Sequence, residues 1–398
     1  MIIEGFYVDE KGEKAYGQIE FNSKIKKISK NITKTPDIKI PKDSVIFPGF
    51  IDLHVHARED SSKKWNYKED YETAGNAAIN GGITAFMDMP NTPVPAVDLL
   101  SLNSKKKLSE KSKIDVYLYA GIGDNTKPIK GQGFYKVFMT KSVGELYFKN
   151  YDSLEKQLKK YRNHVISFHC EDAEIIEKDS SRPKEAEIKA IGKAIELTKK
   201  YNLKANICHV STKQGLKLIE EAKKSKLKLT CEATPHHLFF DKGNVKNFVN
   251  SRLIKMNPPI RDREDRLYLI NGLKNGSIDF LATDHAPHTL EEKQKDNPSG
   301  VPHLDTYGNF VSWLIKENGF SLKRIMEITS LNPAKFLGIN QRIIKKGYTA
   351  SFTVLNLNKK TTIEKSMLKT KCKWSPFEGY TFPGDVVMTI VKGKCFEL

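Results

Sequence analysis

Two histidines, His54 and His56, stand two residues apart at the end of a short apolar run that begins at residue 49. Alternate side chains of an extended strand point to the same side, so both imidazoles would face one point just where the strand ends. Imidazole pairs in this arrangement are suited to binding a metal ion. Taken alone, the pair is equally compatible with two histidines at a solvated strand edge.

Further residues of this chemistry lie in or directly after later apolar runs: Lys136, His169, His209 and Asp284. Each alone has an ordinary explanation, such as a hydrogen-bonded histidine or an ion-paired lysine. Their common position at strand ends, together with the histidine pair, predicts one shared site. Imidazole and carboxylate ligands suit zinc best, with manganese, cobalt or iron as alternatives.

Lys136 is the exceptional member of the set, because a protonated ammonium has no lone pair for a cation. It would act as a ligand only after reaction with carbon dioxide, which gives a carbamate with two oxygens. We therefore expect two Zn2+ ions bridged by N6-carboxylated Lys136. The other ligands then divide into His54, His56 and Asp284 at one ion and His169 and His209 at the other.

Eight strand-like runs position these residues, and helical-period segments such as 67–80, 184–200 and 213–224 separate most of them. This alternation predicts an α/β fold, a (β/α)8 TIM barrel with its chemistry at the C-terminal ends of the strands. A doubly wound open sheet is the alternative, but no Gly-rich phosphate turn follows the first strand. The predicted strands are 49–55, 83–89, 116–122, 134–139, 165–170, 205–210, 228–233 and 279–283.

Short strand-like runs separated by turn residues occupy both ends of the chain. We expect the N- and C-terminal segments, 1–48 and 344–398, to form one small β-sandwich domain. The barrel domain would then span 49–343.

The 398-residue chain carries 66 Lys and Arg against 48 Asp and Glu, a net charge of +18. The excess is spread along helical faces as lysine pairs without aromatic interleaving, so we expect no nucleic acid partner, although the positive field would attract an anionic substrate. We expect no signal peptide, because an early acid interrupts the first apolar residues, and no apolar run reaches the roughly 18 residues that a membrane helix needs. With five cysteines and no CxxC pair, we expect a cytoplasmic protein that does not bind membranes.

The motifs around these residues resemble the amidohydrolase superfamily and, within it, the class I dihydroorotases of the carbamylated-lysine type. The similarity covers about residues 47–338. The blocks that carry it are, in order, Gly49-Phe-Ile-Asp-Leu-His-Val-His-Ala-Arg58, Asp88-Met-Pro-Asn-Thr92, Tyr135-Lys-Val-Phe-Met139, His169-Cys-Glu-Asp172, Cys208-His-Val-Ser-Thr212, Thr234-Pro-His-His237, Met256-Asn-Pro-Pro-Ile-Arg261 and Ala282-Thr-Asp-His-Ala-Pro-His288.

The resemblance implies a metal-dependent cyclic amide hydrolase that interconverts N-carbamoyl-L-aspartate and (S)-dihydroorotate in de novo pyrimidine (UMP) synthesis. Asp284 would be its catalytic residue, a base and then an acid that passes a proton to the departing ring nitrogen. Arg58 would hold the substrate α-carboxylate through its planar guanidinium. The small-molecule substrate would thus be recognised by its carboxylate as well as by its ring.

Further substrate contacts are implied by the same resemblance: Asn91, Asn257, His288, Pro302 and His303. Asn91 and Asn257 have alternative interpretations as turn or cap residues. His303 stands where many relatives carry glycine, which changes the loop that would read the ring amide.

Three positions have two interpretations each. Ser142 would belong to a loop that closes over the substrate, or to an exposed turn. Cys208 and Glu232 match positions that help hold a third metal in some animal relatives, but we favour a buried structural cysteine and a carboxylate behind the ligands. The remaining histidines are expected to support or pack against the ligands (His236, His237 and His285) or to lie at the surface (His164).

Two other functions share parts of this pattern. An allantoinase or hydantoinase would use the same metal ligands, but Arg58 and the Asn257 block favour a ring that carries a carboxylate. A metal-free, dihydroorotase-like partner of aspartate transcarbamoylase would have lost several ligands, and all six are present. The resemblance further implies a homodimer and an association with aspartate transcarbamoylase.

Overall fold

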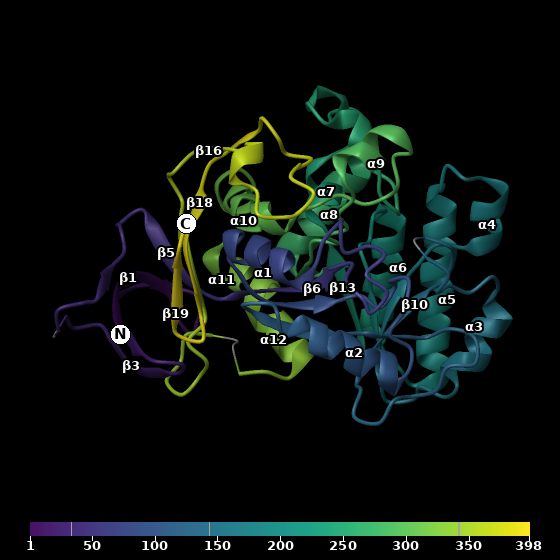
Figure 1. Cartoon of the computed structure of the whole chain (residues 1–398), viewed down its shortest axis with the longest axis horizontal. Coiled ribbons are helices and arrows are strands. Elements are labelled where there is room, and N and C mark those ends of the chain that lie inside the picture. The colour runs from purple at the N-terminus through teal and green to yellow at the C-terminus, as the bar shows by residue number, and fades with distance from the viewer. Residues whose placement is uncertain (33, 143, 341–342) are drawn as a thin grey trace.

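The computed structural model describes residues 1–32, 34–142, 144–340 and 343–398 (Figure 1). Its strands are β1 (Ile2–Val8), β2 (Lys14–Phe21), β3 (Ile25–Ser29), β4 (Ile38–Lys39), β5 (Ser44–Pro48), β6 (Phe50–Val55), β7 (Ile83–Asp88), β8 (Asp115–Leu118), β9 (Ala120–Gly121), β10 (Phe134–Phe138), β11 (Val165–His169), β12 (Lys204–Ile207), β13 (Leu229–Ala233), β14 (Phe280–Leu281), β15 (Phe352–Asn356), β16 (Thr361–Thr362), β17 (Thr381–Phe382), β18 (Asp385–Val391) and β19 (Lys394–Glu397).

Helices lie between most of these strands. They are α1 (Tyr71–Asn80), α2 (Leu99–Ser109), α3 (Tyr151–Leu158), α4 (Ala173–Lys178), α5 (Lys184–Tyr201), α6 (Lys213–Lys224), α7 (Pro235–Phe239), α8 (Arg263–Asn275), α9 (Leu290–Lys295), α10 (Tyr307–Lys316), α11 (Leu322–Met326) and α12 (Asn332–Leu337). Short 3-10 helices are η1 (Val245–Asn247), η2 (Ser251–Leu253), η3 (Leu304–Thr306) and η5 (Lys365–Met367), and η4 (Glu327–Leu331) is a π-helix. None of the helices in the described ranges is both long and apolar enough to cross a bilayer.

The barrel is built from parallel strands in two hydrogen-bonded groups, β6-β7-β8 and β9 to β14. The predicted third strand is interrupted at Tyr119: β8 pairs with β7 and β9 pairs with β10, so this run joins the two groups. The first and last strands meet through a bridge between Val55 and His285 and a hydrogen bond of 3.0 Å from Thr283 N to Asp52 Oδ1. The (β/α)8 prediction is confirmed.

Local sequence explains how these elements form. All six residues of β6 are buried, as expected for a barrel strand covered on both faces. Asp70 begins α1 with a capping box to Thr73, and Asp98 begins α2 in the same way with Ser101. The helices of the outer ring are amphipathic and bury one face against the strands.

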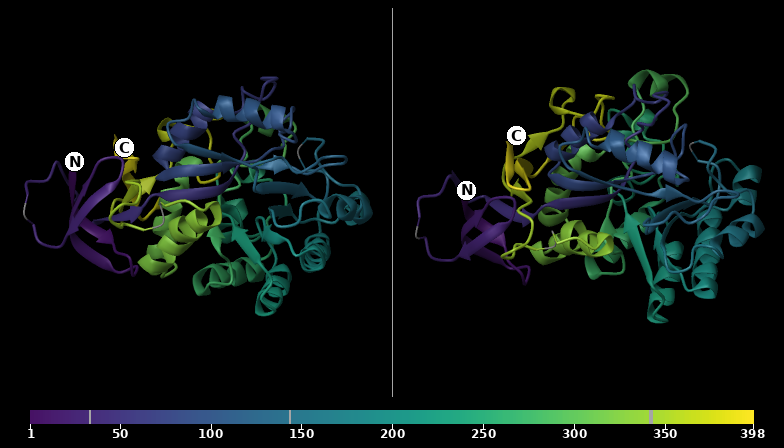
Figure 2. Two further views of the ribbon diagram at one scale, coloured as in Figure 1. Left: turned by 90° about the horizontal axis from the view of Figure 1, so that it is seen from below. Right: turned by 60° about the horizontal axis from the view of Figure 1, so that its bottom comes forward.

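The N- and C-terminal strands join in a single sheet in the order β19-β18-β15-β5-β1-β2-β3, with β4 beside β1. Ile25 of β3 and Ile390 of β18, from opposite ends of this order, share one buried cluster, so the sheet folds over its own core. Figure 2 shows the sheet at one end of the molecule, beside the barrel. The chain enters the barrel at Gly49, where a Cβ atom would lie 2.3 Å from Thr84 Oγ1.

The segment 368–374, which we call the C-terminal strap, leaves the terminal sheet and packs on the barrel. The amides of Lys369 and Thr370 donate to Asp305, and Trp374 Nε1 donates to the carbonyl of His288. The division into 1–48 plus 344–398 and 49–343 stays a prediction. The strap lies against the barrel rather than in the sheet, and so does Phe377, which packs on Phe239 and Phe240.

Candidate active site

Three potential ligands meet where β6 and β14 end. Asp284 Oδ1 lies 3.2 Å from His54 Nε2 and 3.2 Å from His56 Nε2. One ligand atom from each of the three residues lies within 4.8 Å of the others. The side chains of His56 and Asp284 are 10% and 11% exposed, so this corner of the group is open to a substrate.

Two more imidazoles approach from β11 and β12. His169 Nδ1 lies 3.0 Å from His209 Nε2, and the rings of His209 and His54 are 5.2 Å apart. Among the described residues, the buried His209 Nδ1 has no hydrogen-bond partner. Buried imidazole nitrogens are normally satisfied, so an unpartnered nitrogen among four converging histidines fits a metal-binding role.

Lys136 of β10 is completely buried behind these histidines. Its Nζ donates to Cys208 Sγ at 2.8 Å, and within the described parts of the chain it forms no ion pair. A buried lysine without a carboxylate partner in the described chain is unusual, because burying an unpaired charge is costly.

Glu232 of β13 lies on the other side of His54. Its Oε1 makes a close contact with His54 Nδ1 and accepts a hydrogen bond of 3.3 Å from His209 N. Glu232 therefore orients the His54 ring as a supporting carboxylate would. His54, Cys208 and Glu232 also offer ligand atoms within 4.8 Å of one another, so the geometry is compatible with both interpretations of Cys208 and Glu232.

Backbone strain accumulates at this end of the barrel. Arg58, His209 and Asp284 all have positive φ angles, of 63°, 36° and 48°. Non-glycine residues adopt this region at a cost, and they do so mostly where the surroundings fix a functional geometry.

Burial dominates the electrostatics of the cluster. It lowers the pKa of His56 to about 3 and the pKa values of His169 and His209 below their ordinary range. Burial alone would raise the pKa of Asp284, but the histidines around it, His54 first, hold it well below its usual value. His56, His169 and His209 are thus neutral and Asp284 is ionised, which are the forms that bind metal ions.

A cavity opens beside the cluster, and three of the predicted substrate contacts, Arg58, Asn91 and Asn257, line it. It is lined by His54, His56, Arg58, Asn91, Phe138, Ser142, His169, His209, Met256, Asn257, Asp284, Ala286, Ser299 and Gly300. Asn257 Nδ2 lies 3.5 Å from Ser142 Oγ, and Ser299 Oγ donates to Asn257 Oδ1 at 3.0 Å. Ser142 therefore faces the cavity rather than forming an isolated surface turn.

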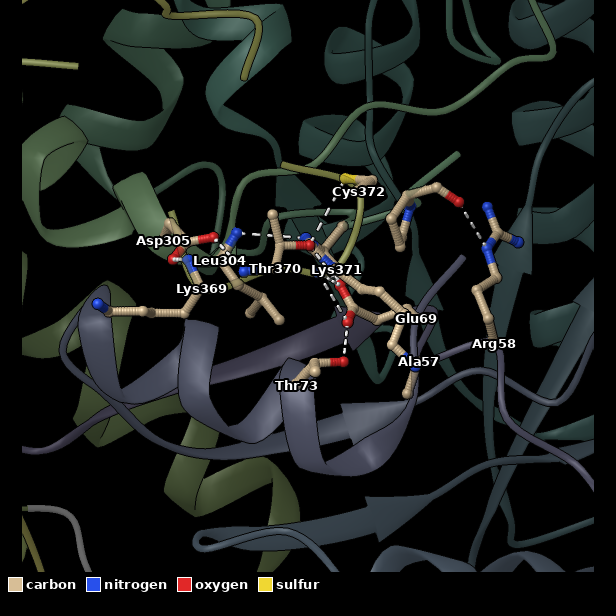
Figure 3. Close-up of polar contacts among 12 residues, drawn as sticks. Ala57, Arg58, Glu69, Thr73, Leu304, Asp305, Lys369, Thr370, Lys371 and Cys372 are labelled. Carbon is tan, nitrogen blue, oxygen red and sulfur yellow. Dashed lines mark hydrogen bonds and ion pairs between the residues drawn. The ribbon is translucent and has the colours of Figure 1, made fainter. Parts of the chain in front are cut away.

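Arg58 is 1% exposed and is held at the cavity wall. Its Nε donates to the carbonyl of Pro287 at 3.2 Å, drawn at the right of Figure 3, and its Nη2 lies 3.3 Å from His288 Nε2. Lys68 Nζ lies 3.1 Å from His288 Nδ1. Burial, followed by the two cations Arg58 and Lys68, lowers the pKa of His288, so this ring is neutral and the corner attracts anions.

Other predicted residues lie behind the cavity wall. Among the described residues that line the cavity, Ser299 and Gly300 represent the 299–305 loop, and Pro302 and His303 do not appear. His303 stacks on His236, with 3.0 Å between His303 Nε2 and His236 Nδ1. His237 Nε2 contacts the carbonyl of Pro258 at 3.0 Å. The half-buried His164 packs against Tyr135.

Several residues of the site had not been singled out from the sequence. Glu171 lies 2.8 Å from His169 Nε2 and also contacts Arg182. Its place two residues after His169 was a signal that could have identified it. Lys68 carries no such local signal, whereas Met256 opens the Met256-Asn-Pro-Pro-Ile-Arg261 block and Ser299 and Gly300 open the loop expected to read the ring amide.

Comparison with known proteins gives consistent results. Residues 45–395 match the sequence profile of the amidohydrolase family. The chain is 37% identical to a dihydroorotase of Pyrococcus furiosus over 396 residues, 99% of this chain and 92% of that protein. It is 32% identical to a dihydroorotase of Bacillus subtilis over 423 residues, 99% of this chain and 97% of that protein.

Solved structures show the same architecture. An L-hydantoinase (dihydropyrimidinase) from Arthrobacter aurescens superposes with a TM-score of 0.90 at 25% identity, over 99% of this chain and 95% of that one. A D-hydantoinase (dihydropyrimidinase) from a Thermus species gives a TM-score of 0.86 at 21% identity, over 99% and 94% of the two chains, and shares the fold.

Proposed function

The chain belongs to the amidohydrolase family, and from this premise we propose that it acts as a dihydroorotase. It would interconvert N-carbamoyl-L-aspartate and (S)-dihydroorotate plus water, a step of pyrimidine synthesis. The observation that carries the proposal is the cavity in which Arg58 faces the group formed by His54, His56 and Asp284. The three potential metal ligands and the carboxylate-binding Arg58 would therefore contact the same small molecule.

The donor set fits a binuclear metal centre. Neutral imidazoles and an ionised carboxylate are the required ligand forms, and His209 Nδ1 is a buried nitrogen without a partner in the described chain. His54, His56 and Asp284 would hold one ion and His169 and His209 the other, with carboxylated Lys136 between them. Two divalent ions bound there would polarise the amide carbonyl and make water a better nucleophile.

The chain's own groups bind and orient the substrate. The Arg58 guanidinium would pair with the substrate carboxylate, since it lines the cavity and the nearby Lys68 is already paired with Glu292 at 2.8 Å. Asn91, Asn257 and His288 lie in or beside the same wall and would contact the carboxylate and the ring. Ser142 would donate a hydrogen bond from its side of the cavity. The loop around Pro302 and His303 would contact the ring amide, next to Ser299 and Gly300, which line the cavity.

Asp284 would move the proton. Its carboxylate is ionised and partly open to the cavity, so it can accept a proton from water during ring opening. It would then deliver this proton to the departing ring nitrogen. Ring closure is the reverse, with protonated Asp284 helping water to leave.

The test combines metal analysis of the purified protein with a dihydroorotate turnover assay. We expect about two divalent ions per chain, and the Asp284→Asn variant is expected to retain much of the metal while losing nearly all turnover. Since general acid–base groups contribute about 100- to 10,000-fold, a variant with more than a tenth of the wild-type kcat would exclude the assigned role.

A hydantoinase or allantoinase is the second candidate, favoured by the superposition on the L-hydantoinase structure. Arg58 argues for a substrate with a carboxylate on its ring. Parallel assays with dihydroorotate, allantoin and hydantoins decide between them: turnover of a hydantoin without turnover of dihydroorotate would replace the proposal.

Finer properties belong to the same proposal. Zinc is the metal we propose, since imidazole-rich open sites suit it. We also propose a homodimer, an association with aspartate transcarbamoylase and a cytoplasmic location, the last supported by five free cysteines. A catalytic enzyme is favoured over a metal-free partner protein because the potential ligands converge.

A further inference from the structure

The C-terminal strap, 368–374, is tied to loops that follow the last barrel strand. Near its start, the amides of Lys369 and Thr370 donate to the buried Asp305 at 2.6 and 3.1 Å. At its end, Trp374 Nε1 donates to the carbonyl of His288 at 2.8 Å. A segment far along the chain from the metal-binding motifs is thereby fixed against the site.

Glu69, just before α1, is the buried carboxylate on which the middle of the strap rests (Figure 3). It accepts close hydrogen bonds from the hydroxyls of Thr73 and Thr370 and a bond of 3.2 Å from Lys371 N. Its Oε2 also lies 3.4 Å from His285 Nε2. One side chain therefore joins α1, the strap and the loop after β14.

The hydrogen bonds around His285 determine which of its nitrogens carries the proton. His285 Nδ1 accepts from His303 N at 3.1 Å and from Leu304 N at 3.3 Å, so it is unprotonated. Nε2 then carries the hydrogen and donates it to Glu69. The ring is completely buried, so Glu69 is the group that holds this end of it.

Asp284 lies between Thr283 and His285, and hydrogen bonds hold both of these neighbours in place. Its φ of 48° is a strained conformation that needs support from its neighbours. On one side, Thr283 N donates to Asp52 at 3.0 Å. On the other, His285 is fixed by Glu69 through its ring and by His56 N through its carbonyl, at 2.8 Å.

We propose that Glu69 is a positioning residue. By binding both the strap and the ring of His285, it fixes the backbone next to Asp284 and so orients the Asp284 carboxylate. The proposal rests on the proposed function. Loss of this link would leave the histidine ligands in place but turn Asp284 away from its reactive orientation. Supporting groups of this kind are worth about 10- to 100-fold in activity.

The experiment uses the full chain loaded with Co2+. In Glu69→Gln we expect kcat for dihydroorotate to fall by about 10- to 100-fold, with the visible Co2+ absorption bands shifted. KM should change by less than about threefold, because Arg58 is not altered. Thr370→Val, which removes only the strap's hydroxyl contact, should shift kcat and the bands in the same direction by less, and Thr370→Ser should restore both.

Asp241→Asn is the matched control. Asp241 is a buried carboxylate that accepts two backbone amides and pairs with Arg266, away from the strap. Hydrogen exchange of residues 283–286 gives a readout without metal, and it should be faster in Glu69→Gln and Thr370→Val than in the wild type or in the control.

Three outcomes would overturn the proposal: wild-type kcat and bands in the Glu69 and Thr370→Val variants, the same losses in Asp241→Asn, or unchanged exchange at 283–286. If Glu69→Gln does not fold, Thr370→Val and Thr370→Ser decide the question. Wild-type protein that does not turn over dihydroorotate would refute the proposed function, and the exchange measurement would still test whether Glu69 holds the backbone around Asp284.

Discussion

Lys136 illustrates how a single residue type constrains the chemistry. Lysine at a barrel strand end has ordinary uses, but here its amine is completely buried and its partner in the described chain is a thiol rather than a carboxylate. The carbamate that we propose would give this buried side chain two oxygens with which to bind metal ions. The uncharged amine is the form that reacts with carbon dioxide.

The first prediction concerns this residue. Lys136→Ala should lose one of two metal ions and most of its turnover, because the proposed bridging ligand is gone. Short carboxylic acids should restore part of the activity by occupying the vacated space. Metal content and kcat are measured with and without the added acid, and full activity of the variant without it would refute the bridging carbamate.

Lys293 is a second buried lysine, and it lies outside the ligand set. Its Nζ donates to the carbonyls of Pro298 and Gly300 at 2.7 and 3.2 Å, so it holds the loop that lines the cavity. Burial and the nearby Lys255 lower the pKa of Lys293 to about 7. In the unfolded chain the pKa returns to its ordinary value of 10.5.

The second prediction follows from that difference. Between pH 7 and 10 the unfolded chain binds the proton that folded Lys293 releases, so the free energy of unfolding should rise with pH, by at most about 1.4 kcal/mol per unit. Lys293→Met should remove this rise relative to the wild type, and Lys295→Met, exposed on the same helix, should keep it. Urea unfolding at several pH values measures the slopes, and equal slopes for all three proteins would contradict the prediction.

At the scale of elements, helix α2 offers a test separate from the site. Asp98 caps it by accepting from Ser101 N at 2.8 Å, and the Ser101 contacts lower the pKa of Asp98. The Asp98 cap therefore stabilises the folded chain at neutral pH, and this contribution is lost as the pH falls through the lowered pKa of Asp98.

The third prediction is that Asp98→Ala reduces the free energy of unfolding by about 1 kcal/mol at pH 7 and leaves kcat unchanged. Asp43→Ala, at an exposed turn position, should change stability by less than about 0.5 kcal/mol. Denaturant unfolding measures both. Equal stability of the two variants would mean that the cap contributes nothing.

At the scale of the whole molecule, the terminal sheet and the barrel share buried hydrogen bonds. Thr353 Oγ1 of β15 donates to the carbonyl of Gly82 at 2.6 Å and accepts from Phe50 N at 3.1 Å. Thr389 Oγ1 of β18 donates to the carbonyl of Ile79 at 2.7 Å. Because the sheet supplies partners that the barrel backbone lacks, we expect both to unfold in one transition.

The fourth prediction tests this connection. Thr353→Val keeps the side-chain shape but leaves Gly82 O and Phe50 N unpaired, which should cost about 1–3 kcal/mol of unfolding free energy. Thr362→Val, on the exposed strand β16, should cost less than about 0.5 kcal/mol. Two separated thermal transitions, or equal stability of the variants, would argue against coupling through Thr353.

The barrel and the convergence of the ligands were predictable because their signals are local. A strand directs alternate residues to one side, so His54 and His56 had to share a direction wherever the strand lay. Parallel strands bring their C-terminal ends to one edge, which brought His169, His209 and Asp284 together. The one interrupted strand, at Tyr119, differs because its two halves pair with different neighbours.

Tertiary packing decided what local patterns could not. Ser299 and Gly300 line the cavity, whereas the ring of His303 packs on the buried His236. The contact of Glu69 with Thr370 joins residues that the sequence does not relate. Such contacts depend on the positions of long loops. These positions follow from the packing of the whole chain rather than from short-range periodicity.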